Sequence, residues 1–157
     1  EKQVISVEKE KAYQEGFRPH LKLLDGLDIF LEKSRRGDIK MAIGSAAILM
    51  NIDFVLDGLG VRKYFSGIVS ADDVTRSKPD PETYLKCAGI LDVEPGYCLV
   101  FEDSPKGTEA ARHAGMDCVV ITTMHEPEEF DLANIIRFTK DFTGHLYESI
   151  NSNKEQV

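Results

Sequence analysis

The sequence has little positive charge, no long apolar run and few cysteines, and each shortage excludes a class of protein. Its 157 residues hold 19 Lys and Arg against 27 Asp and Glu, for a net charge of −8. Nucleic acids and anionic membranes are bound through basic surfaces, so we expect neither as a partner. No segment approaches the roughly 18 apolar residues of a membrane-spanning helix. The opening residues also lack the apolar core of a signal peptide.

The three cysteines are Cys87, Cys98 and Cys118. Their number is odd, they form no Cys-x-x-Cys pair, and they have no metal-ligand spacing with the histidines. We therefore interpret them as buried thiols of a protein in the reducing cytoplasm. The histidines are dispersed, and we assign none of them a catalytic role. No Gly-x-Gly-x-x-Gly follows an apolar run, which argues against a dinucleotide-binding domain.

The composition and length fit one globular domain. The hydrophobic fraction is 42% and the charged fraction 29%, and the length is too short for two ordinary domains. Pro19 is expected to end a polar N-terminal helix, because proline has no N–H and biases the preceding residue away from helical dihedrals. We predict a separate unit over residues 1–18, a main domain over 19–150 and a frayed tail over 151–157.

From residue 27 onward, apolar runs alternate with helical patterns. This alternation predicts right-handed crossovers, and hence an α/β fold with a parallel sheet covered on both faces. Ligands bind beyond the carboxyl ends of the strands in such sheets. The predicted strands are residues 39–43, 68–70, 98–101 and 119–122, with a weak apolar run at 134–138. The predicted helices are residues 46–59, residues 80–89, residues 142–150, one that runs from residue 27 to a terminator at Gly37, and one opened by Ser104 and Pro105.

Ser45 follows the first predicted strand and precedes a helical pattern. The commonest role of a serine at such a junction is to cap the helix. A helix N-terminus also presents free N–H groups and partial positive charge, so the same serine can help to seat a phosphate. Gly44 would let the backbone come close to that ligand. Both interpretations stay open.

Lys78 stands in the string Ser77-Lys78-Pro79-Asp80-Pro81, between two structured elements. An ordinary lysine is solvated at the surface. The two prolines fix the backbone beside this one, however. An ammonium charge at a strand edge suits a phosphoryl oxygen or a nucleophilic carboxylate that needs charge compensation. We predict a functional lysine.

Glu102 and Asp103 follow an apolar run directly. Two adjacent carboxylates at the end of a buried strand repel each other and lose solvation, so they need a compensating cation. Mg²⁺ takes oxygen ligands, keeps several waters and bridges to phosphate. We predict Asp103 as a metal ligand and Glu102 as a ligand or as an acceptor behind it. Acidic residues that favour a helix N-terminus are the alternative, and they explain Asp103 better than Glu102.

The order of these strings resembles that of the haloacid dehalogenase-like hydrolases. Within that family it is most similar to the group of β-phosphoglucomutase and small sugar-phosphate phosphatases. The resemblance spans roughly residues 20–140, and it is carried by Gly44-Ser45, Lys78-Pro79-Asp80-Pro81 and the run from Phe101 to Met116.

The resemblance implies a three-layer, Rossmann-like parallel sheet, with residues 1–18 as the remnant of a helical cap. It implies that Ser45, Ala46 and Lys78 bind phosphate, that Lys78 is the catalytic lysine, and that Glu102 and Asp103 hold Mg²⁺.

The family's first motif is absent from the sequence. That motif is an apolar strand followed by Asp-x-Asp-Gly, whose first Asp attacks phosphorus and whose second acts as general acid and base. Asp25-Gly26-Leu27-Asp28 is no substitute, because no apolar strand precedes it. Since the sequence also begins without Met, we expect a piece of a longer protein or a processed form. We expect this chain alone to be inactive and its open sheet to favour self-association or strand exchange.

We predict Mg²⁺-dependent phosphoryl transfer on a small phosphorylated metabolite, which the resemblance implies to be a sugar phosphate. The enzyme would be a phosphatase or a phosphomutase that works through an aspartyl-phosphate. One alternative is a phospho-acceptor signalling module, but its acid pair follows the first strand rather than Lys78. The other is a non-catalytic module that binds phosphate or metal, which the sequence before Glu1 would distinguish from the enzyme.

Overall fold

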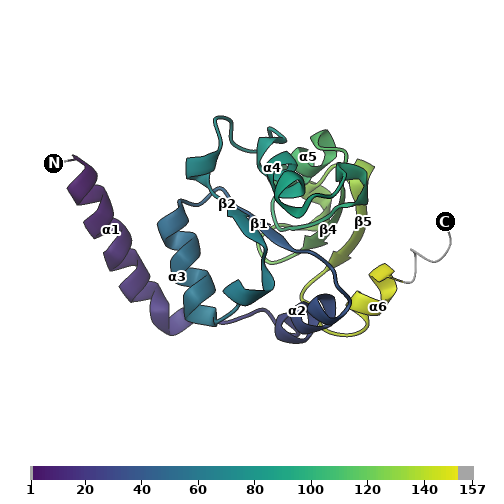
Figure 1. The fold of residues 1–157 in the computed structure, drawn as a ribbon, viewed down its shortest axis with the longest axis horizontal. Helices are drawn as coiled ribbons and strands as arrows, with labels where there is room; N and C mark the ends of the chain where they lie inside the picture. The colour runs from purple at the N-terminus through teal and green to yellow at the C-terminus, as the bar shows by residue number, and fades with distance from the viewer. Residues whose placement is uncertain (1, 152–157) are drawn as a thin grey trace.

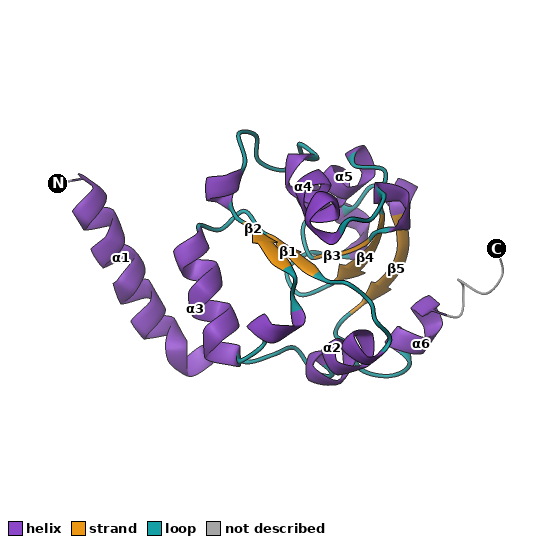
Figure 2. Cartoon of the chain, in the orientation of Figure 1, coloured by secondary structure: helices purple, strands orange, loops and turns teal. Residues whose placement is uncertain are grey.

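The computed structural model describes residues 2–151, with side chains from residue 7 to residue 150. It is an α/β structure with parallel strands, which confirms the predicted fold class (Figures 1 and 2). The strands are β1 (Ala42–Gly44), β2 (Gly67–Val69), β3 (Leu99–Glu102), β4 (Asp117–Ile121) and β5 (Ile135–Thr139). The helices are α1 (Lys2–Phe17), α2 (Leu27–Arg36), α3 (Leu49–Leu59), α4 (Glu82–Leu91), α5 (Pro105–His113) and α6 (Leu146–Asn151).

The strands form two separate sheets. β1 pairs with β2, and β3, β4 and β5 pair in that order. Within residues 2–151, no strand pairs with the second edge of β1 or with the second edge of β3. Both sheets are nevertheless covered by the same helical layer, because α4 contacts β1 and β2 and also packs against α5, which contacts β3 and β4.

Helices lie on both sides of the strands. α4 and α5 lie on one side, and α2 and α6 on the other (Figure 1). The side chains of β3 alternate accordingly: Val100 belongs to the core cluster with residues of α4 and α5, whereas the ring of Phe101 packs 5.3 Å from that of Phe30 in α2. This alternation turns Glu102 toward α4 and α5.

The first predicted strand differs from the observed one. β1 covers Ala42–Gly44 instead of residues 39–43, and its residues are half-buried rather than buried on both faces. Burial on both faces requires strands on both edges and helices on both sides. β1 has one strand neighbour among the described residues, so its segment stays short and partly exposed.

Two predicted helix ends are also wrong. The helix predicted to begin at Ala46 begins at Leu49. The helix predicted to stop near Gly89 continues to Leu91, where Asp92 takes the left-handed conformation with φ 52°. By contrast, α5 begins as predicted: Ser104 is its N-cap and accepts from Gly107 N at 3.1 Å, and Pro105 is its first residue.

Only part of the apolar side of α3 is buried. Ile52 and Leu56 are buried and pack with Ile43 and Ile68 of the small sheet. Leu49 is 42% exposed and Val55 36% exposed. The two-stranded sheet covers only the part of the helix that holds Ile52 and Leu56.

The first and last helices, α1 and α6, lie at opposite ends of the described structure (Figure 1). α1 ends at Phe17, before the predicted breaker Pro19, and packs against α3. α6 begins at Leu146 rather than at residue 142, and almost all of the predicted tail 151–157 lies outside the described residues. The division at residues 18 and 150 stays a prediction.

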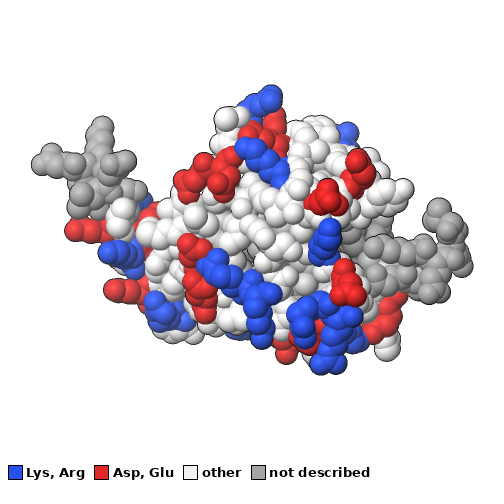
Figure 3. All heavy atoms as spheres, viewed as in Figure 1, with Lys and Arg blue, Asp and Glu red and all other residues white. Residues whose placement is uncertain are grey.

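Acidic and basic side chains alternate over the face shown in Figure 3, where neither sign forms one continuous surface. In the part of the chain that the structure describes, no helix combines the length and apolar content needed to cross a membrane.

Candidate active site

Lys78 contacts the strings that hold Gly44-Ser45 and Glu102-Asp103, so all three strings meet. Its Nζ donates to the carbonyl of Gly44, the last residue of β1, at 3.3 Å, and to Oε1 of Glu102, the last residue of β3. Lys78 therefore connects the carboxyl ends of the two sheets, at the edge where ligands bind in parallel α/β folds. Its side chain is 11% exposed and that of Glu102 is 7% exposed.

The carboxylate of Glu102 is held by donors at both oxygens. Oε1 accepts from Lys78 Nζ and from the hydroxyl of Tyr84. Oε2 accepts from Asp103 N at 3.0 Å and from Ser104 N and Oγ at 3.2 and 3.0 Å. Burial alone would raise the pKa of Glu102, but the charge and hydrogen bond of Lys78, with the bonds from Tyr84 and Ser104, lower it below its usual value. Glu102 is thus an ionised partner for Lys78.

Gly107 makes room for this carboxylate. A Cβ at position 107 would lie 1.9 Å from Cδ of Glu102 and close to both of its oxygens. The glycine, in the first turn of α5, is therefore required by the close approach of Glu102 and not by backbone conformation.

Asp103 differs from its neighbour. It is exposed, and its carboxylate has no protein donor among the described residues. Its chemistry suits Mg²⁺, which often takes one or two carboxylates and completes its shell with water and substrate phosphate. No group of three potential ligands gathers anywhere in the described part of the chain. Asp103 can therefore supply one ligand, while both oxygens of Glu102 are already occupied by protein donors.

Ser45 follows β1 at the same edge but does not cap α3. Its Oγ accepts from Ala47 N at 3.1 Å, and its own N–H bonds to Val69 O. Ala46 is exposed, and its N–H has no acceptor among the described residues, so it is free for a ligand. The helix N-terminus is occupied instead by Asp72, whose Oδ2 accepts from Leu49 N at 2.9 Å. The predicted cap is wrong, because three residues separate Ser45 from the helix.

Tyr84 is the site residue that sequence reasoning missed. It lies in the first turn of α4, is 6% exposed, and its hydroxyl contacts both Lys78 and Glu102. Burial, then the charge of Glu102, raises the pKa of Tyr84 well above its usual value, so the phenol stays protonated. The sequence does place a tyrosine, an aromatic residue with a hydroxyl, two residues after Glu82 on the helix that directly follows Lys78. This position could have indicated a hydrogen-bonding group near Lys78.

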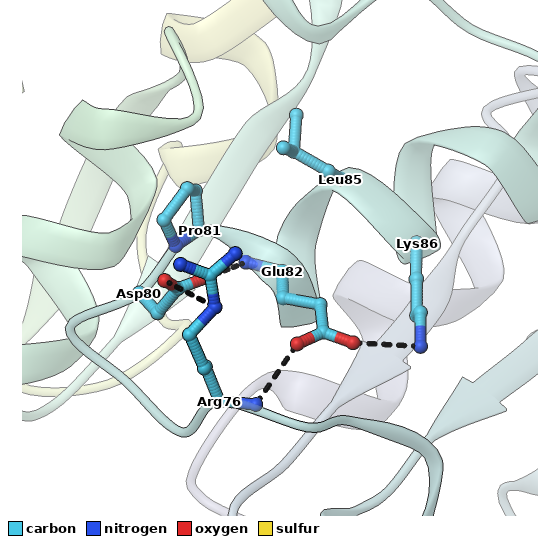
Figure 4. A pocket seen from close by; sticks show the side chains of 6 residues that line it. All are labelled: Arg76, Asp80, Pro81, Glu82, Leu85 and Lys86. Carbon is cyan, nitrogen blue, oxygen red and sulfur yellow. Dashed lines mark hydrogen bonds and ion pairs between the residues drawn. The ribbon is translucent and has the colours of Figure 1, made fainter.

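Glu82 fixes the loop that carries Lys78. Its carboxylate accepts from the backbone N–H groups of Thr75 and Arg76 at 3.0 and 2.9 Å and pairs with Lys86 at 2.9 Å (Figure 4). The bond from Lys86, followed by the backbone bonds, lowers the pKa of Glu82 to about 2. An open pocket lies beside these contacts of Glu82, and neither Lys78 nor Glu102 lines it. Its lining residues are Arg76, Asp80, Pro81, Glu82, Leu85 and Lys86 (Figure 4).

The family model for haloacid dehalogenase-like hydrolases matches residues 1–121. The chain belongs to this family. The resemblance predicted from the order of the motifs is thereby confirmed.

Individual relatives agree with this membership. Fructose-1-phosphate phosphatase of Escherichia coli is 42% identical over 101 residues, covering 62% of this chain and 54% of the relative. Validoxylamine A 7′-phosphate phosphatase of Streptomyces hygroscopicus is 34% identical over 120 residues, covering 76% of this chain and 55% of the relative. The crystal structure of β-phosphoglucomutase from Clostridium difficile superposes with a TM-score of 0.82 at 26% identity, covering 99% of this chain and 68% of that one. The chain thus spans little more than half the length of these two curated phosphatases.

Proposed function

We propose that the complete protein is a Mg²⁺-dependent phosphoryl-transfer enzyme, a phosphatase or phosphomutase, that acts on a small sugar phosphate. The observation that carries this proposal is the position of Lys78. Its ammonium is held between the carboxyl ends of β1 and β3 by an ionised Glu102. A fixed cation at that place is suited to the oxygens of a transferring phosphoryl group.

Each residue at this edge then has a role. The free N–H of Ala46 and the hydroxyl of Ser45 would bind phosphoryl oxygens, and Lys78 would offset their charge. Glu102 keeps Lys78 in place. Asp103 would hold the Mg²⁺ ion, which supplies charge neutralisation at the phosphate when bound.

The two-sheet arrangement supports the proposal that another strand completes the site. β1 and β3 each have an edge without a strand partner in residues 2–151, and Lys78 joins their carboxyl ends. A parallel strand inserted between them would bring its own carboxyl end to Lys78. We propose that this strand carries the Asp-x-Asp motif whose first Asp forms the aspartyl-phosphate. Without it, the open edges would favour self-association or strand exchange.

The names of the relatives support the class of substrate. Fructose 1-phosphate and validoxylamine A 7′-phosphate are named as the substrates of two relatives, and a phosphoglucomutase has the same fold. These ligands share a phosphate ester on a polyhydroxylated ring or chain. We propose a substrate of that class for this protein.

A mutation at Asp103 tests the proposal. A protein that carries the proposed Asp-x-Asp strand together with residues 1–157 should hydrolyse an aryl phosphate in the presence of Mg²⁺. Asp103→Asn should reduce kcat at least about a hundredfold, because the negative charge that develops on the phosphoryl group would lose the positive charge of the metal ion. Turnover is measured by release of the aryl alcohol, with and without EDTA.

Asp28→Asn is the matched control, because Asp28 is an exposed acid in the first turn of α2 on the other side of the sheets. Unchanged activity of Asp103→Asn would refute the metal assignment. A complete protein that binds phosphate but never turns over would favour the non-catalytic binding module.

A further inference from the structure

Tyr84 lies against both members of the Lys78–Glu102 pair. Its hydroxyl accepts from Lys78 Nζ at 2.8 Å and donates to Glu102 Oε1. Its ring lies beneath the same ammonium, with Nζ 4.6 Å from the ring centroid. The side chain is 6% exposed, so water cannot easily replace the hydroxyl.

The ammonium of Lys78 has no spare donor in this arrangement. A lysine ammonium carries three N–H groups, and three acceptors surround this one: Gly44 O, Tyr84 Oη and Glu102 Oε1. A phosphoryl oxygen that binds Lys78 must therefore displace one of them. The bond to Gly44 O is the longest of the three at 3.3 Å, and it is made at the end of β1, beside Ser45. It is the bond most readily exchanged.

We propose that Tyr84 is a positioning residue that holds two N–H groups of Lys78 together with Glu102 and leaves the third for the phosphoryl group. The inference deepens the proposed function and rests on it. With Glu102 alone, the flexible four-carbon chain of lysine could turn about a single strong partner. With the hydroxyl of Tyr84 also in place, the ammonium has two fixed directions, so its third N–H points toward Gly44.

Tyr84→Phe separates this role from packing. Phenylalanine keeps the ring, which packs with Ala88 and Val100 in the core, and removes only the hydroxyl. Loss of a hydrogen bond to a charged group in the complete protein should lower kcat roughly tenfold. KM should change less than about twofold, since the remaining phosphate ligands are intact. Tyr97→Phe is the matched control, because Tyr97 is 83% exposed.

A spectroscopic measurement tests the contact without any turnover. In the 157-residue chain labelled with ¹⁵N-lysine, the protons of the Lys78 ammonium should exchange with water much more slowly than those of Lys106, an exposed lysine with no partner among the described residues. Lys78→Met assigns the signal. Tyr84→Phe should accelerate the exchange of that signal at least severalfold, and Tyr97→Phe should leave it unchanged.

The outcomes distinguish the two proposals. Faster exchange together with a lower kcat and a steady KM supports the positioning role. Exchange at Lys78 as fast as at Lys106 in the unmutated chain overturns it, even if Tyr84→Phe does not fold. Faster exchange with an unchanged kcat also overturns it. If the complete protein has no turnover at all, the proposed function fails and the positioning role falls with it, while slow exchange would still establish the three-way contact.

Discussion

At the scale of single residues, the site depends on the buried ion pair of Lys78 and Glu102, in which both side chains make further hydrogen bonds. Breaking a buried pair by removing one partner is costly because the other charge stays buried. Glu102 has donors at both oxygens, and Lys78 has an acceptor for each N–H. The Lys78–Glu102 pair is therefore a buried, rigidly held ion pair and not a mobile surface contact.

The close packing of Gly107 against Glu102 can be tested by a change in the free energy of unfolding. Gly107→Ala should lower the free energy of unfolding by about 1–3 kcal/mol, because its Cβ would overlap the carboxylate and force Glu102 to move. Urea denaturation measures the change.

The matched control is Gly89→Ala. Gly89 lies within α4 with nothing close to its missing Cβ, so alanine should stabilise the protein by roughly 0.5–1 kcal/mol. Equal effects of the two substitutions would show that Glu102 does not occupy the space beside Gly107.

At the scale of elements, the start of α3 is set by a residue distant in sequence. Asp72 accepts from Leu49 N, and Ala71 N bonds to Ala47 O, so two loops that follow neighbouring strands hold each other. The carboxylate of Asp72 therefore also occupies the positive end of the helix.

Asp72→Ala should therefore destabilise the protein by about 0.5–2 kcal/mol, the usual cost of losing an N-cap. Asp72→Asn should retain most of the stability because the amide oxygen can still accept from Leu49 N. Thermal unfolding monitored by circular dichroism compares the two variants. A loss that is the same in both would mean that the charge, and not the hydrogen bond, matters.

These contacts explain where sequence reasoning succeeded and where it did not. The cap at Ser104 and the proline at position 105 act within one turn, so their pattern predicted the start of α5 correctly. The same local reasoning failed at Ser45, because its helix is capped by Asp72 from another loop. The approach of Lys78 and Glu102 to one edge of the sheets could be expected from their strings, whereas the contact of Tyr84 with both could not, because it depends on how the loop returns to α4.

At the scale of the whole molecule, the strands form two sheets, and we propose that the nucleophile strand belongs between β1 and β3. The two parts are joined by the shared layer of α4 and α5 and, at their carboxyl ends, by Lys78. The chain thus holds the phosphate-binding and metal-binding residues that we propose, arranged around the place for one further strand. This arrangement accounts for a fold that superposes on a phosphomutase although no Asp-x-Asp occurs in the sequence.

The role of Lys78 at the end of an inserted strand is tested by the turnover of an aryl phosphate, compared between this chain, the complete protein and its Lys78→Met variant at equal concentration with Mg²⁺. We expect no hydrolysis above background by the 157-residue chain, clear hydrolysis by the complete protein, and a loss of roughly a hundredfold or more on removal of the ammonium. Turnover by the chain alone, or full activity of Lys78→Met, would contradict this role.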